Sequence, residues 1–160
     1  DIAEIPRHLD DWLQRANDPP IFLNSIGGLG SPFWRPGPEP AIIGNGAPWQ
    51  RVVAVAESIL FLLQANLDAM RAAGLAAERI QIGGGLARSD ALCQRLADLS
   101  GAAVYRPAET EATARGAAWL AAGRPSHWPE VSPGTSFAPQ PNPGLARRYL
   151  RFRQEMKLDS

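Results

Sequence analysis

Apolar residues at helical spacing fill the middle of the chain. They recur three and four positions apart between Pro48, which suits a first helical turn, and Ala73, which precedes Gly74. The spacing predicts a helix over residues 48–73 that ends at this glycine. Its expected apolar stripe is Val52, Val55, Ala56, Ile59, Leu63, Leu67 and Met70, widened by Leu60, Phe61 and Leu62. We therefore expect the middle of this helix to lie in the core.

One carboxylate interrupts the most apolar part of this helix. Glu57 lies between Ala56 and Ser58, inside the stripe. A buried carboxylate is costly unless it is paired. We therefore expect a partner for Glu57 at the rim of the core, or hydrogen-bonding backbone, rather than a catalytic role.

Shorter patterns come before the long helix. Residues 1–16 contain a short amphipathic helix, which a proline pair at 19–20 ends, and residues 21–23 are a candidate strand. Residues 24–40 are rich in Gly and Pro, so we expect a loop there that Phe33 and Trp34 anchor by aromatic burial. The apolar side of the first helix consists of Leu9, Trp12 and Leu13.

A different pattern covers residues 79–90, where a short apolar strand runs into Gly83, Gly84 and Gly85 and then into a helix start at Ser89. Three residues without Cβ let a large ligand approach the backbone. The following helix is expected to offer unpaired N–H groups and the positive end of its dipole. Such a turn can bind phosphate, although a tight connection between strand and helix explains three glycines equally well.

The residue sequence of this turn argues against two other phosphate-binding motifs. A dinucleotide fold requires Gly-x-Gly-x-x-Gly with an acidic residue further on, and a Walker loop requires Gly-Lys-Ser/Thr. Neither is present at residues 83–90.

The elements after the glycines repeat the alternation of helix and strand. Ser89 is a plausible N-cap of a helix that ends at Gly101, a strand covers residues 102–105, and Thr110 is a plausible cap of a second helix. Gly116 inside that second helix costs about 1 kcal/mol relative to Ala, so we expect it to allow close packing on another backbone. The first of these helices carries an apolar stripe made of Leu92, Leu96 and Leu99.

These residues together resemble the C-terminal lobe of the FGGY carbohydrate kinases. The glycine run at 83–85, the helix at 89–100 and the segment 111–118 (EATARGAA) are similar to motifs of that family. Upstream, residues 29–34 look like its loop of a small residue, Pro, an aromatic and Trp, and residues 54–59 resemble its Ala-x-x-Glu-Ser helix. The resemblance covers about residues 22–123.

The resemblance implies a fold class and a domain organisation. It implies an α/β fold, part of an actin-like, ribonuclease H-like ATPase domain with a short mixed sheet and flanking helices. Residues 1–123 would form the C-terminal, nucleotide-binding lobe without its first strands, and residues 124–160 a Pro-rich tail with a terminal helix. In the family an N-terminal lobe binds the sugar and supplies the catalytic base. Both that lobe and the first strands are expected to precede Asp1.

The resemblance also implies the chemistry, namely transfer of phosphate from ATP, with Mg²⁺, to a hydroxyl of a sugar or polyol. Gly84 and Gly85 match the glycines that face the adenosine and α-phosphate, with Gly83 as a weaker member. Ser89 matches the residue that borders adenine or ribose. Asp90 would repel a nearby phosphate, and we expect Arg88 to offset its charge. No catalytic residue is assigned to this chain, and the acceptor would be held mainly by the other lobe.

Two other classes of function stay open. One is a non-catalytic, actin-like binding or assembly module, which the absence of a base-bearing lobe favours for this chain by itself. The other is a Rossmann-type oxidoreductase, which NAD binding would reveal. Members of the family that this chain resembles are often dimers or tetramers, so a homo-oligomer is also possible for this chain.

Composition sets further limits. The chain has 160 residues, 45% of them hydrophobic and 20% charged, with a formal net charge of +0; this suffices for one core and indicates neither a nucleic acid nor a membrane as partner. We expect no segment as long as a membrane span and no metal site around His8 or His127. The single Cys93 excludes an internal disulfide and suits a core position and a cytoplasmic location.

The composition changes after Gly123. Six prolines between residues 124 and 144 predict an extended tail on the surface. A final helix over residues 145–156 is expected to pack through Leu145, Tyr149 and Phe152.

Overall fold

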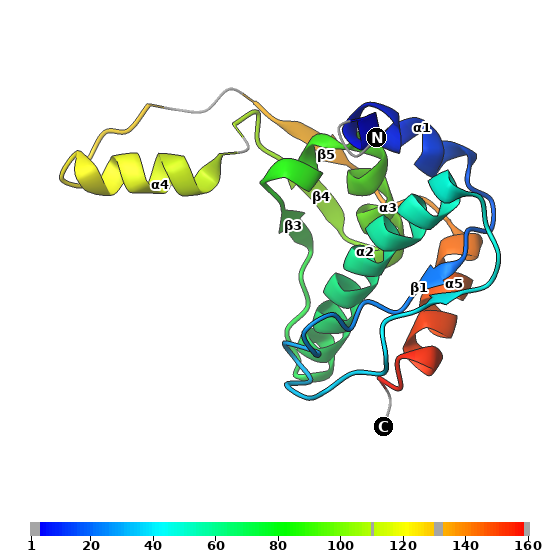
Figure 1. Ribbon diagram of the computed structural model, residues 1–160. Helices are drawn as coiled ribbons and strands as arrows, with labels where there is room; N and C mark the ends of the chain where they lie inside the picture. The colour runs from blue at the N-terminus through cyan, green and yellow to red at the C-terminus, as the bar shows by residue number, and fades with distance from the viewer. Residues whose placement is uncertain (1–3, 110, 130–132, 159–160) are drawn as a thin grey trace.

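The computed structural model describes residues 4–109, 111–129 and 133–158. Helices and short strands alternate along them, which confirms the predicted α/β class (Figure 1). In chain order the elements are α1 (Ile5–Arg15), β1 (Ile21–Phe22), β2 (Ile42–Ile43), α2 (Pro48–Ala72), β3 (Arg79–Gln81), the 3-10 helix η2 (Gly85–Arg88), α3 (Asp90–Ser100), β4 (Ala103–Arg106), α4 (Ala112–Ala121), β5 (Thr135–Phe137) and α5 (Pro143–Glu155).

The main sheet has the strand order β3-β4-β5, with β3 parallel to β4 and β5 antiparallel to it. Strand β5 lies in the Pro-rich region, where the backbone is extended as predicted, but it pairs with the sheet instead of forming a free surface tail. Phe137 of β5 pairs with Val104 of β4 and is buried. Among the described residues β3 is an outer strand of this sheet. Its far edge is therefore open to another strand.

Two apolar clusters form the core. The first lies between α1, α2, α3 and the main sheet and includes Leu13, Val53 and Val104. The second lies between α2, α5 and the β1-β2 ribbon, where Phe61 contacts the rings of Tyr149 and Phe152. Leu145, Tyr149 and Phe152 are all buried, which confirms the predicted packing of the last helix.

The middle of the long helix α2 lies in the core as expected, but the buried face overlaps the predicted stripe only in part. Val55, Leu63 and Met70 of the predicted stripe are 42%, 45% and 43% exposed. Apolar residues occupy both sides of α2, so periodicity alone could not identify the covered side. The buried residues of α2 are Val53, Ala54, Ala56, Glu57, Ser58, Leu60, Phe61, Gln64 and Ala65.

The expectation that no segment reaches the length of a membrane span is also wrong. Helix α2 has 25 residues and is apolar enough to cross a bilayer by length and composition. Half of its most apolar window is buried inside the protein, as in a core helix.

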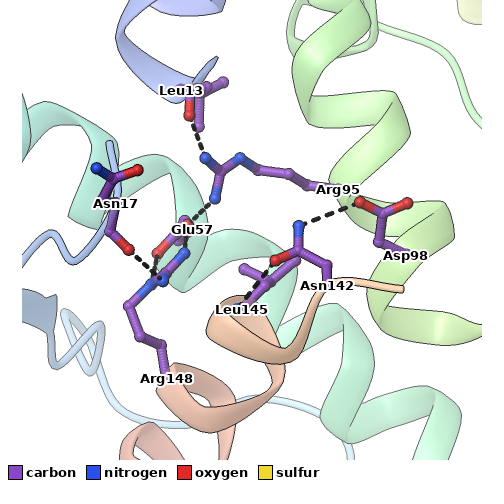
Figure 2. A network of polar contacts seen from close by, with 8 residues as sticks. All are labelled: Leu13, Asn17, Glu57, Arg95, Asp98, Asn142, Leu145 and Arg148. Carbon is purple, nitrogen blue, oxygen red and sulfur yellow. Dashed lines mark hydrogen bonds and ion pairs between the residues drawn. The ribbon is translucent and has the colours of Figure 1, made fainter. Parts of the chain in front are cut away.

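A buried ion-pair network joins four elements around Glu57, whose side chain is 1% exposed (Figure 2). Arg148 of α5 donates from Nε to Oε2 at 2.9 Å and from Nη2 to Oε1 at 2.6 Å. Arg95 of α3 donates to Oε1 as well, and also to the carbonyl oxygen of Leu13 in α1. Arg148 reaches the carbonyl oxygen of Asn17 at 3.3 Å. Glu57 therefore has the expected partners, but inside the protein rather than at the rim of the core.

Helix α4 stands away from both clusters (Figure 1), and none of its described residues is buried. No atom lies within 4 Å of a Cβ built on Gly116, so the expected close packing at this glycine is not observed. The helix contacts the segment after it, where Arg115 lies over the ring of Trp128 and Trp119 donates to the carbonyl oxygen of Pro125. Thr110, its proposed cap, lies outside the described residues.

Only one of the two aromatic residues expected to anchor the loop at 24–40 packs against the core. Phe33 packs against the second cluster, but Trp34 is 80% exposed. The prediction for Trp34 is therefore wrong.

Removing the carboxylate charge of Glu57 tests the network. In Glu57→Gln two buried guanidinium groups lose their counterion, so we expect the free energy of unfolding to fall by about 3–5 kcal/mol, measured by urea denaturation. Glu155→Gln breaks an exposed pair with Arg151 and is expected to cost less than about 1 kcal/mol. Equal costs for the two variants would contradict the assignment.

Candidate functional site

The glycine turn lies at the carboxyl end of β3 and is open. Gly83, Gly84 and Gly85 are exposed, and no atom lies within 4 Å of a Cβ built on Gly84 or Gly85. Gly84 has φ +89°, a conformation that residues with a Cβ rarely adopt. The turn therefore requires glycine at 84, whereas at 85 the absence of a side chain leaves free space.

The chain does not pass directly from the glycines into α3. The 3-10 helix η2 intervenes, and Ser89 follows it as the N-cap of α3, its Oγ accepting from the Leu92 amide at 3.1 Å. The predicted capping role of Ser89 is thus confirmed. The Ser89 hydroxyl donates to the carboxylate of Asp10 in α1, which also accepts from the Ala91 amide at 3.3 Å.

These contacts change the expected chemistry of the α3 N-terminus. The amides of Ala91 and Leu92 already have acceptors within the protein, so the expectation of unpaired N–H groups is wrong for both. Asp10 also places a negative charge at the positive end of the helix dipole. Asp10 and Ser89 are 79 positions apart, and no local pattern could reveal their contact.

The charges beside the turn are paired differently from the prediction. Arg106 of β4 approaches Asp90 at 2.7 Å and donates to the Ala87 carbonyl oxygen at 2.9 Å. Arg88 pairs instead with Glu111 at 3.1 Å. The expectation that Arg88 offsets Asp90 is therefore wrong, because Arg106 does so. Arg106 comes from the neighbouring strand β4, and the sequence analysis did not predict its pairing with Asp90.

Two hollows of different character lie near the turn. Gly83 and Leu86 line an apolar groove of about 200 Å³, whose other walls include Leu63 of α2. Arg88 and Arg106 line a polar cavity of about 480 Å³. An open backbone with apolar walls and guanidinium groups nearby can accommodate a ligand that is partly flat and apolar and partly anionic.

Cys93 lies behind this turn in the core. It is 1% exposed, and its thiol donates to the Ala87 carbonyl oxygen at 3.2 Å. Burial raises the pKa of the Cys93 thiol, which keeps it protonated and unreactive at neutral pH. The predicted core position is confirmed.

Comparison with known proteins finds one matching family. Residues 7–123 match the model of the C-terminal domain of the FGGY family of carbohydrate kinases. A glycerol kinase from Rhizobium rhizogenes is 42% identical over 127 residues, which make up 75% of this chain and 25% of that enzyme. A glycerol kinase from Shewanella amazonensis is 39% identical over 108 residues, which make up 65% of this chain and 22% of that enzyme.

Solved structures show the same fold. Plasmodium falciparum glycerol kinase, crystallised with ADP, superposes with a TM-score of 0.74 at 19% identity, covering 96% of this chain and 33% of that one. Xylulose kinase from Rhodospirillum rubrum gives 0.68 at 21% identity, covering 98% of this chain and 33% of that one. The fold is thus that of the C-terminal lobe of these actin-like kinases. The chain spans about a quarter to a third of the length of the proteins it matches.

A structural role of Ser89 can be measured apart from any ligand. In Ser89→Ala helix α3 loses its N-cap, and Asp10 loses a hydrogen-bond donor, so we expect the free energy of unfolding to fall by about 1 kcal/mol, measured by urea denaturation. Ser126→Ala, which alters an exposed serine beside His127, is expected to stay within about 0.5 kcal/mol of the parent protein. A Ser89→Ala variant as stable as the parent would contradict the capping role.

Proposed function

This chain belongs to the FGGY family of carbohydrate kinases, and we propose that it forms the nucleotide-contacting part of an enzyme that transfers phosphate from ATP to a hydroxyl of a sugar or polyol. The chain spans only a fraction of its relatives. The groups that hold the acceptor and take up its proton would therefore belong to other parts of the enzyme. Membership of a kinase family leaves the Rossmann-type oxidoreductase without support.

The observation that carries the proposal is the open backbone at Gly84 and Gly85. No side chain fills the space beside either glycine, so the adenosine of a nucleotide could approach the main chain directly. The ADP in the Plasmodium glycerol kinase structure supports a nucleotide as the ligand. The hydroxyl of Ser89 donates its proton to Asp10 and accepts one hydrogen bond from the Leu92 amide. Towards the base or ribose it could therefore offer only its second lone pair.

This geometry favours adenosine over phosphate as the group that the chain itself contacts. The amides of Ala91 and Leu92 in α3 are taken by Asp10 and Ser89. Phosphoryl transfer depends on holding two substrates in line and on spreading charge over donors and Mg²⁺. Within the described residues no group of three His, Cys, Asp or Glu could hold a metal. Mg²⁺ would be bound by the phosphates of the nucleotide together with one or two carboxylates of the complete enzyme.

One observation also favours the second candidate, a binding or assembly module. The far edge of β3 and the apolar residues Val55 and Met70, which do not line the groove beside Gly83, are exposed among the described residues, and such surfaces usually meet another polypeptide. In a complete kinase they would pack against the remainder of the enzyme. In a non-catalytic module they would bind a different protein. We place either form in the cytoplasm, where the lone thiol of Cys93 would stay reduced.

The test is a titration of the chain with ADP, followed through the backbone amide signals by NMR. We expect saturable shifts at Gly84, Gly85 and Leu86. In Gly85→Val the branched side chain would fill the space that adenosine needs, so the dissociation constant should rise at least about tenfold while the other signals keep their positions. Gly30→Val is the matched control, because its Cβ also meets no atom within 4 Å.

Two results would overturn the proposal. One is the absence of saturable shifts at residues 83–89 at millimolar ADP. The other is the same ADP affinity in Gly85→Val as in Gly30→Val. Saturable binding of NAD but not of ADP would instead revive the oxidoreductase.

A further inference from the structure

A second polar cavity lies away from the glycine turn, between the start of α5 and the segments beside β1 and β2. Its volume is about 190 Å³, and it shares no lining residue with the groove or the cavity beside the glycines. Its lining includes three arginines of α5. Pro20, Asn45 and Asp18 also line it. The arginines are Arg147, Arg148 and Arg151.

The positive charge of this cavity is only partly compensated. Arg148 is paired with Glu57 through Nε and Nη2, so its own charge is compensated and it offers the cavity only Nη1, which lies beside Gly144. Arg151 lies 3.9 Å from Glu155, with both side chains exposed, and such a pair is weak. Arg147 has no ion-pair partner among the residues that the structure describes. Asp18 alone contributes a negative charge to the lining.

Two of these charges lie on the same side of α5. Arg147 and Arg151 are four residues apart in this helix, a spacing at which like charges repel. An anion between their guanidinium groups would reduce this repulsion.

Gly144 leaves room for such an anion. A Cβ built on Gly144 would lie 3.5 Å from Nη1 of Arg148 and 4.0 Å from Nη2 of Arg147. The two guanidinium groups therefore face one small space beside a residue without a side chain. A methyl group there would make only ordinary contacts, so Gly144→Ala should fold normally while narrowing that space.

We propose that this cavity binds a phosphate group, either as inorganic phosphate or as the end of a phosphate monoester. Guanidinium groups match the oxygens of phosphate through paired hydrogen bonds. The volume of about 190 Å³ is below that of pockets for drug-sized ligands, which indicates a small anion or the anionic end of a larger molecule. The apolar wall, which includes Ile21 and Ile43, would contact the ester group. The assignment does not depend on the proposed kinase activity.

The experiment titrates the chain with inorganic phosphate and, separately, with methyl phosphate, in NMR samples of matched ionic strength made up with chloride. We expect saturable shifts of the amides of Asn45, Gly144 and Arg147. Arg147→Gln removes a charge that has no partner in the described protein, and it should weaken binding about tenfold or more. Arg7→Gln removes one exposed charge from α1, outside the cavity lining, and should leave the affinity unchanged. Gly144→Ala should weaken binding without moving signals outside the cavity.

Each outcome decides the assignment. Equal affinity for both probes supports recognition of the phosphate dianion alone, and tighter binding of methyl phosphate supports contact with the ester group. Shifts that rise linearly with phosphate and do not saturate would overturn the proposal. The same affinity in Arg147→Gln as in Arg7→Gln would also overturn it.

Discussion

The buried contact between Glu57 and two arginines is the constraint on which the rest of the structure depends. Arg95 brings α3 against α1 and α2, and Arg148 brings α5 against α2 (Figure 2). A second contact, from Asn142 at the start of α5 to Asp98 of α3, joins α5 directly to α3. A buried ion pair contributes little net stability compared with apolar packing, but one partner alone is very costly. The network therefore disfavours any arrangement of these helices that leaves one of its charges buried without a partner.

That arrangement determines the character of the glycine turn. With α1 held against α3, Asp10 reaches the first turn of α3 and accepts the hydrogen bonds that a bound phosphate would otherwise accept. Arg106 neutralises Asp90 from the neighbouring strand. What the turn offers to a ligand is consequently an accessible main chain at Gly84 and Gly85, with an apolar groove beside Gly83. This is the basis of the proposal that the chain contacts the adenosine part of a nucleotide rather than its phosphates.

Local chemistry made some of this predictable from the sequence. Helix α2 begins at Pro48 and α3 is capped by Ser89 and Gly101, because these residues act on their own neighbours. Most of the predictions that were wrong concern partners distant in the sequence, whereas the apolar character of α2 over the length of a membrane span, which was underestimated, is a property of its own residues. The covered side of α2, the exposure of Trp34, the pairing of β5 and the contacts of Asp10 and Arg106 all depend on how the elements pack. The exposed apolar side of α2 and the free edge of β3 could not be predicted for the same reason. The sequence shows that residues are apolar or form a strand, but it does not show which element covers them.

The most direct test of the account is to measure intermolecular nuclear Overhauser effects between ADP and the chain. The account predicts contacts from the ribose and adenine protons to the α-protons of Gly84 and Gly85. Contacts that avoid residues 83–89 and involve only other surfaces would contradict it, and with it the assignment of this turn as the nucleotide-contacting site.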